Sequence, residues 1–177
     1  MGYPGIFPTG TTVYNKDKAW NGYTVFPTKK GALLIDMNGN EVKLWAGLEG
    51  FPNKILPGGY VLGSTGSIKS KYSYQDEKDL VQVDWNGNIV WKFDKTEFYA
   101  DPGQEPQYFA RQHHDYQREG STVGYYYPGG EPKTDSGNTF ILTHENLYNH
   151  DISDKRLIDD KIIEVDWEGN IVWSWRA

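Results

Sequence analysis

The sequence contains no cysteine, which excludes thiol nucleophiles, disulfide bonds, zinc–thiolate sites and iron–sulfur clusters. It has no apolar run of the roughly 20 residues that a membrane-spanning helix needs. Its N-terminus has neither the basic residues nor the continuous apolar stretch of a signal peptide. We therefore expect no membrane partner and a cytoplasmic protein, or a periplasmic one if the chain is a processed form.

Positive charge is also scarce, with 18 Lys and Arg against 24 Asp and Glu and a net charge of −6. A broad basic surface for nucleic acid is not expected from this balance, because such binding needs cationic side chains to displace counterions. Aromatic residues make up 15% of the chain, which excludes a disordered polypeptide. The length of 177 residues predicts one domain, spanning residues 1–177.

One pattern occurs three times, in residues 34–45, 81–93 and 163–175. Each copy is a β-branched run, an Asp-x-x-Gly-Asn turn, and a second run that contains Trp. Gly and Asn tolerate the positive φ of tight turns, so each copy predicts a β-hairpin. The first two turn glycines are 48 residues apart, which matches one propeller blade of about 40–50 residues, and the next lies 82 residues further on, which fits a blade with a large insertion.

A second hairpin is predicted before each copy, pairing residues 12–14 with 23–26, 53–56 with 60–62, and 112–117 with 138–143. The sequence thus predicts an all-β fold, a β-propeller of four-stranded antiparallel blades, with three blades at approximately 12–45, 53–93 and 112–175. Because rings of this kind have four to eight blades, we expect an incomplete ring, closed by a second half-propeller from another chain or a second copy. The alternative is an ordinary β-sandwich with similar hairpins.

Blade topology places three long segments, 64–79, 94–111 and 144–160, on one face of the predicted ring. Loops on a rigid β scaffold commonly carry function. The four histidines fall on or near this face: His113 and His114 at the start of a channel-lining strand, His144 at the end of the next strand, and His150 in the loop after it.

Alternation along an extended strand puts Arg111, His113 and Asp115 on one side, and Gln112, His114 and Tyr116 on the other. Adjacent histidines on such a strand do not easily bind one metal ion. We expect one histidine to face the channel and the other to be held by a neighbour such as Asp115. A buried histidine that only hydrogen-bonds to the backbone is the alternative, but the His-His-Asp run beside Arg111 favours function.

Other features favour structural roles. Trp45, Trp91 and Trp173 recur at equivalent positions and predict packing between blades, and the repeated Asp-x-x-Gly-Asn segments lack the spaced ligands of calcium loops. The aromatic segment 125–130 predicts packing or an oligomer contact. Four acidic residues could hold a cation, although a solvated loop is favoured for them: Asp151, Asp154, Asp159 and Asp160.

Residues 14–24, 34–39, 56–59 and 110–120 resemble the arylsulfotransferase (aryl-sulfate sulfotransferase) family. The resemblance runs over nearly the whole chain, and the His113-His114-Asp115 run is its most specific part. It implies a six-bladed propeller that transfers a sulfuryl group from a phenolic sulfate ester to a phenol through a sulfated histidine, without a cofactor. Family members are about twice as long, so the chain resembles their N-terminal half, and the later blades supply further active-site residues.

The resemblance and the residue types together predict a site with no metal. The expected catalytic residues are His114, His113 and Arg111, and the expected substrate-binding residues are His144, Tyr116 and Asp115. Imidazole can form a covalent sulfuryl intermediate, and Arg or a protonated His can stabilise charge on the sulfuryl oxygens. His or Tyr can act as the general acid. The alternatives are a non-catalytic assembly or ligand-binding propeller and, more remotely, a quinoprotein-like redox propeller.

Overall fold

The computed structural model describes residues 11, 13–69, 76–121 and 130–177, which form antiparallel β-sheets and no α-helix. The first sheet contains β1 (Thr24–Thr28), β2 (Gly31–Ile35) and β3 (Glu41–Ala46). The second contains β4 (Lys54–Leu56), β5 (Tyr60–Gly63), β6 (Leu80–Val83) and β7 (Ile89–Phe93), with the 3-10 turn η1 (Pro57–Gly59) between β4 and β5. The third contains β10 (Gln112–Arg118), β11 (Thr139–Leu147), β12 (Leu157–Val165) and β13 (Ile171–Arg176). A separate hairpin pairs β8 (Glu97–Tyr99) with β9 (Gln107–Phe109). The all-β prediction is confirmed.

The three repeated segments form the hairpins β2–β3, β6–β7 and β12–β13, as predicted. In the second of them the carboxylate of Asp84 accepts hydrogen bonds from the backbone N–H and the side-chain amide of Asn88, both at 2.8 Å. Gly87 lies between them with φ of 94°, a conformation that favours glycine. The same carboxylate–Asn contacts recur at the other two turns, which explains why Asp, Gly and Asn are repeated and shows that these segments are turns.

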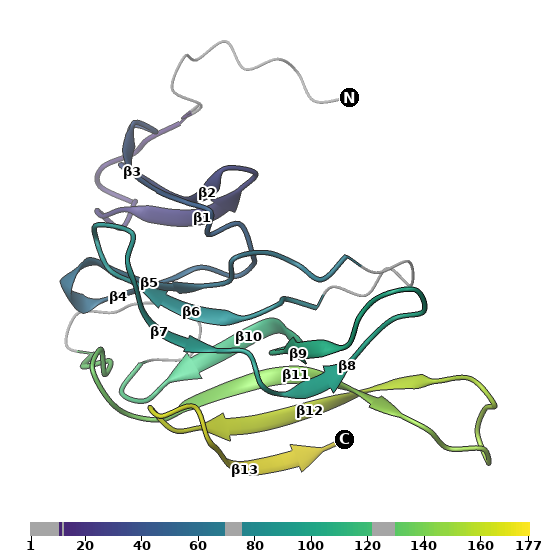
Figure 1. Ribbon diagram of the computed structural model, residues 1–177. Coiled ribbons are helices and arrows are strands. Elements are labelled where there is room, and N and C mark those ends of the chain that lie inside the picture. The colour runs from purple at the N-terminus through teal and green to yellow at the C-terminus, as the bar shows by residue number, and fades with distance from the viewer. Residues whose placement is uncertain (1–10, 12, 70–75, 122–129) are drawn as a thin grey trace, which may run out of the picture.

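The three large sheets stack in sequence order, with the second between the other two (Figure 1). Side chains along the strands of the middle sheet point alternately to its two faces, and both faces carry apolar residues. Val61 packs toward the first sheet and Leu62 toward the third. Strand β6 is buried throughout because it is covered on both sides. The hydrophobic core is therefore two apolar layers, one in each gap between neighbouring sheets.

The first repeat unit differs from the prediction. It has three strands rather than four, because Val13 and Tyr14 belong to no strand and residue 12 lies outside the described residues. Val13 is 85% exposed, so it packs on no apolar surface of the described residues. The next residues turn instead of extending, with the N–H of Ala19 bonded to the carbonyl of Asn15 at 2.9 Å.

Two long segments are also more ordered than predicted. Strands β11 and β12 extend beyond the core and pair as far as Leu147 and Leu157, so the loop expected over 144–160 is confined to 148–156. The segment 94–111 contains the β8–β9 hairpin, stabilised by packing of Tyr99 against Phe109. Most of the aromatic segment 125–130 lies outside the described residues.

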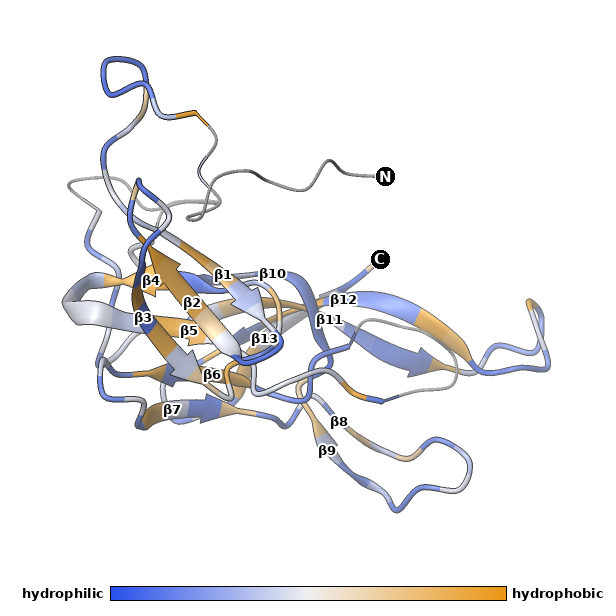
Figure 2. Ribbon diagram, turned by 90° about the horizontal axis from the view of Figure 1, so that it is seen from above, coloured by the Kyte–Doolittle hydropathy of each residue, from blue (hydrophilic) through white to orange (hydrophobic). Residues whose placement is uncertain are grey.

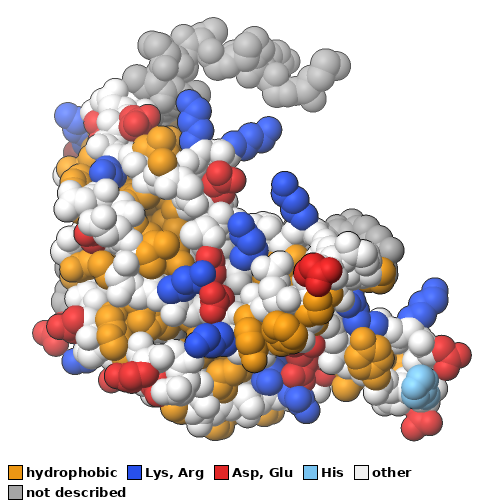
Figure 3. Space-filling view, viewed as in Figure 1, with side chains coloured by type: hydrophobic (Ala, Val, Ile, Leu, Met, Phe, Trp, Pro, Cys, Tyr) orange, Lys and Arg blue, Asp and Glu red, His pale blue; other side chains and the backbone are white. Residues whose placement is uncertain are grey.

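No helix in the described part of the chain is long and apolar enough to cross a bilayer. On the face shown in Figure 3, basic and acidic side chains are interspersed.

Candidate functional site

The described parts of the long segments meet at one end of the stacked sheets. The β8–β9 hairpin and the far ends of β11 and β12 project from this end (Figure 2). Backbone hydrogen bonds join segment 64–79 to the third sheet, since the N–H of Glu77 donates to the carbonyl of Gln112 at 2.8 Å. Asp101 in the β8–β9 loop pairs with Arg156 at 2.7 Å. This end is the only part of the described chain where three histidines converge.

Strand β10 does not keep the regular alternation that we expected. Gln112 pairs with Thr143 and Tyr116 pairs with Ile141, so three residues of β10 lie between the two pairs, whereas only Leu142 lies between them on β11. His114 takes up this excess with φ of 57°, and Arg111 has φ of 51°. Arg111, Gln112 and His113 are all buried, although the predicted alternation put Gln112 on the opposite side of the strand from Arg111 and His113.

The bulge brings His113 against His144 on the adjacent strand β11. Their rings are stacked, with centroids 3.7 Å apart and planes 15° apart. His113 is 4% exposed, and neither of its ring nitrogens has a hydrogen-bond partner among the described residues. Burial first, and then the neighbouring His144, lowers the pKa of His113 to about 4. His113 is therefore a neutral imidazole near pH 7.

The third histidine, His114, lies at the exposed edge of this pair. Its ring meets that of His113 edge-on, with centroids 5.1 Å apart, and its side chain is exposed. His150 does not join the group. It lies in the loop between β11 and β12, exposed and near Asp154.

A network of contacts between charged residues holds His144 in place. Asp76 is fully buried, accepts a hydrogen bond from Nε of Arg111 at 2.6 Å, and lies 2.5 Å from Nδ1 of His144. Arg111 also donates to Glu97 at 2.5 Å and packs over Tyr99. Burial lowers the pKa of the Arg111 guanidinium, but its contacts with Asp76 and Glu97 outweigh this and raise it. Arg111 therefore remains charged and positions Asp76.

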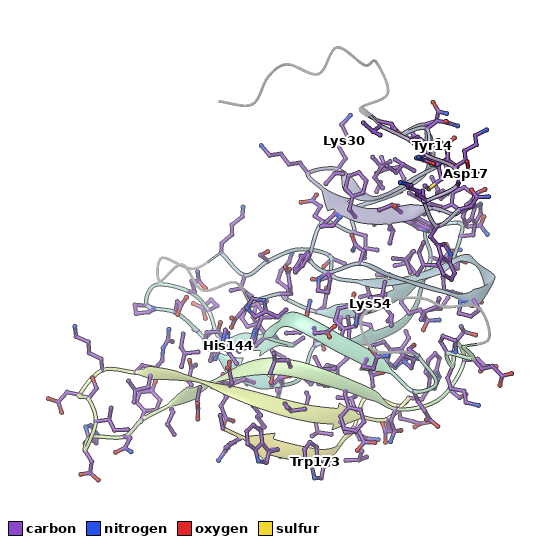
Figure 4. The ribbon with its side chains drawn as sticks, turned by 180° about the vertical axis from the view of Figure 1, so that it is seen from behind. Tyr14, Asp17, Lys30, Lys54, His144 and Trp173 are labelled. Atoms are coloured by element: carbon purple, nitrogen blue, oxygen red, sulfur yellow. The ribbon has the colours of Figure 1, made fainter. Side chains whose placement is uncertain are left out.

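Two predicted site residues lie elsewhere. Asp115 pairs with Lys54, not with a histidine, and Figure 4 shows Lys54 well separated from His144. Tyr116 is buried in the core, where its hydroxyl lies 2.6 Å from the carbonyl of Pro52 and 2.9 Å from that of Leu62. Burial raises the pKa of Tyr116 well above its ordinary value. The structure thus brings Arg111, His113, His114 and His144 together, and separates Asp115 and Tyr116 from them.

Acidic residues complete the site. Asp160, directly opposite His144 in the β11–β12 pairing, has its Oδ1 3.3 Å from Nε2 of both His113 and His144. Asp160 is in strand β12, whereas Asp151 and Asp154 are exposed in the loop, as predicted. Sequence reasoning missed Asp76 and Glu97, which come from segments far away along the chain. The strand pairing that places Asp160 opposite His144 could have been found by extending the predicted hairpin outward.

The arrangement offers two imidazoles, a carboxylate and an exposed third imidazole at one place, all on or beside paired strands. Such a group can transfer protons, attack an electrophile or ligate a cation. Comparison of the chain with protein-family models, with curated proteins and with solved structures finds no match.

Proposed function

We propose that the three large sheets are consecutive blades of a larger β-propeller, and that a further blade packs on the outer face of β13. The support is a repeated contact. Trp45 of the first sheet packs against Trp85 of the second, and Trp91 of the second packs against Trp167 of the third. Trp173 of the third sheet occupies the equivalent position and is 46% exposed on the outermost strand (Figure 4).

The surface around Trp173 supports the same proposal. Ile171 and Trp175 share a side of β13 with Trp173 and are at least 40% exposed, and Phe140 on β11 contacts Trp173. An apolar face of this kind normally packs against another element. A second half-propeller, from another chain or a second copy, would cover it and complete the ring.

We further propose that the completed protein transfers sulfuryl groups between phenols through a histidine. The observation that carries this proposal is the convergence of His113, His114 and His144. A buried imidazole without a hydrogen-bond partner in the described structure, such as His113, costs free energy of folding and is typical of a site kept for a ligand. His114 is the candidate nucleophile because it is the one of the three with an exposed ring.

The chemistry proceeds in two displacements. The lone pair of the imidazole nitrogen of His114 forms an N–S bond as the ester S–O bond breaks. The departing phenolate keeps the electron pair of the broken S–O bond and takes a proton from a neighbouring acid. A second phenol then forms a new S–O bond as the N–S bond breaks, and its proton returns to the acid.

The electrostatics limit which residue can hold the sulfate. Arg111 is fully buried and bound to Asp76 and Glu97, so it serves by positioning His144 through Asp76. Positive charge for the sulfuryl oxygens would therefore come from other groups, including those of the blades that complete the ring.

The test is release of 4-nitrophenol from 4-nitrophenyl sulfate, with a phenol acceptor, by the protein in its assembled state. The substitution His114→Ala should abolish release and the His150→Ala control should keep it. A peptide containing residues 112–118 should gain one SO3 group during turnover and lose it when acceptor is added. Failure of an assembled protein to turn over several acceptors would refute the enzyme proposal and favour a non-catalytic assembly module, which the exposed face of β13 also supports.

A further inference from the structure

Three neighbouring strands each contribute one potential metal ligand at the same place. His113 comes from β10, His144 from β11 and Asp160 from β12. The β11–β12 register sets His144 directly opposite Asp160, and the β10 bulge carries His113 onto the same pair. Ligands fixed on paired strands hold their geometry better than ligands on loops.

The distances fit a small cation. Ligand atoms of a tetrahedral zinc ion, at about 2.0–2.2 Å from the metal, are separated from one another by about 3.4 Å. Oδ1 of Asp160 lies 3.3 Å from Nε2 of His113 and 3.3 Å from Nε2 of His144. All three ligand atoms lie within 4.8 Å of one another. The rings of His113 and His144 are stacked with planes 15° apart, so they must rotate away from each other for both in-plane lone pairs to point at one ion.

The hydrogen bonds of His144 leave the correct nitrogen available. Its Nδ1 lies 2.5 Å from the carboxylate of Asp76, which favours a proton on Nδ1, and in that tautomer of the neutral ring Nε2 carries a lone pair. Arg111 in turn holds Asp76 through a bond of 2.6 Å. A carboxylate behind a ligating imidazole is the usual second layer of a metal site, where it orients the ring and raises its basicity.

The burial of His113 is an independent observation. Its side chain is 4% exposed, yet neither ring nitrogen makes a hydrogen bond in the part of the chain that the structure describes. Nε2 lies 3.3 Å from Oδ1 of Asp160, but without the geometry of a hydrogen bond. A cation bound at Nε2 would satisfy one of these nitrogens. The stacked His144 ring cannot do so, because it presents its face to His113.

The local charge also favours a divalent cation. Three carboxylates, those of Asp76, Glu97 and Asp160, contact the histidines or Arg111, and Arg111 supplies the one opposing charge. Counting these three carboxylates and Arg111, the group carries two uncompensated negative charges. The other cations nearby, Lys161 and Arg156, are paired with Glu145 and Asp101.

We propose that His113, His144 and Asp160 bind a divalent first-row transition metal ion, with zinc as the best fit. Two imidazole ligands select such ions over magnesium and calcium, which prefer oxygen. Three protein ligands leave a fourth position for water or an anionic oxygen, the arrangement of catalytic rather than structural zinc sites. The proposal concerns binding alone and stands whether or not the protein transfers sulfuryl groups.

The test is zinc binding by the metal-stripped protein near pH 7.5, measured by competition with a chromophoric chelator, together with the visible absorption of bound Co²⁺. One ion per chain is expected, with a tetrahedral Co²⁺ spectrum. The substitutions His144→Ala and Asp160→Asn should each weaken binding at least about tenfold, as should Asp76→Asn through the orientation of His144. Calcium and magnesium should not compete.

Two controls keep the result decisive. His150→Ala removes the other histidine of the β11–β12 region and should leave affinity unchanged, because His150 is outside the cluster. Asp160 is half exposed, so Asp160→Asn should fold normally, which circular dichroism checks. Absence of saturable zinc and Co²⁺ binding would overturn the proposal, as would equal affinity in the wild type and Asp160→Asn.

Discussion

The indole N–H of Trp45 donates a hydrogen bond to the backbone carbonyl of Asp84, 2.8 Å away, and so joins the last strand of one sheet to a turn of the next. Trp91 makes the same kind of bond to the carbonyl of Trp167, also at 2.8 Å. Each bond satisfies both a buried indole and a turn carbonyl, and each lies beside a contact between two Trp rings. The repeated Trp residues therefore connect neighbouring sheets, and the role predicted for them as packing residues is confirmed for Trp45 and Trp91.

This relationship predicts different consequences for two equivalent substitutions. Trp91→Phe replaces a buried indole with a smaller phenyl ring and leaves the carbonyl of Trp167 without its donor, so it should lower the free energy of unfolding by about 2 kcal/mol. Trp173→Phe, on the exposed face, should cost roughly 0.5 kcal/mol or less in the isolated chain. Urea denaturation of both variants provides the measurement. Equal losses of unfolding free energy in the two variants would show that the hydrogen bond from Trp91 to the carbonyl of Trp167 does not contribute to stability.

Much of the fold was predictable because its signals are local. Asp36 and Asn40 bond to one another within five residues, so the sequence of a single turn is sufficient to predict its hairpin. The expected strand at residues 12–14 had β-forming side chains as well, but strand formation also needs a partner edge. The predicted partner does form, as edge strand β1, but Val13 is 85% exposed and does not pair with it, so β-forming side chains alone do not make a strand here.

A second prediction concerns Asp76, which the sequence did not single out. Asp76→Asn leaves the fully buried Arg111 with only part of its charge compensated and removes the anion beside His144. Breaking a buried ion pair in this way costs about 3–5 kcal/mol of unfolding free energy. Asp154→Asn is the matched control, since it alters an exposed His–Asp contact and should change stability by less than about 0.5 kcal/mol. Guanidinium denaturation of both variants measures the loss of unfolding free energy. A small loss for Asp76→Asn would argue that the contacts linking Arg111, Asp76 and His144 do not stabilise the fold.

The site was less predictable than the fold, for a physical reason. Alternation correctly describes a regular strand, but the bulge at His114 depends on a positive φ that no residue type in the run His113–Asp115 dictates. Without the bulge, His113 would not stack on His144. Asp76 lies in the segment between β5 and β6, 35 residues from Arg111 along the sequence. A contact between residues so far apart leaves no local sequence pattern.

A third prediction concerns Glu77, whose pKa is raised chiefly by burial. A carboxyl with a raised pKa in the folded state contributes stability that is fully present below its unfolded value and is lost as pH rises through the folded value. Glu77→Gln removes the charge, so this variant should gain thermal stability relative to the wild type at pH 8 but not at pH 4. Differential scanning calorimetry at the two pH values is the measurement. A gain of equal size at both would rule out the burial of charge as the cause.

The turn carboxylates should show the opposite pH dependence. Hydrogen bonds, first from the side chain of Asn88 and then from its backbone N–H, lower the pKa of Asp84 in the folded state, and Asp36 and Asp166 behave likewise with Asn40 and Asn170. A carboxylate of this kind contributes stability above its unfolded pKa of about 3.9, and that contribution is lost as pH falls through the lower folded value. Asp84→Asn should therefore lower the melting temperature at pH 7, and the difference from the wild type should shrink as the pH approaches 2. Asn88→Ala removes the partner instead and should show the same convergence, whereas Asp135→Asn, outside these turns, should follow the wild-type curve throughout. If the difference between Asp84→Asn and the wild type were constant from pH 7 to pH 2, the charged form of the carboxylate would not be what stabilises the turn.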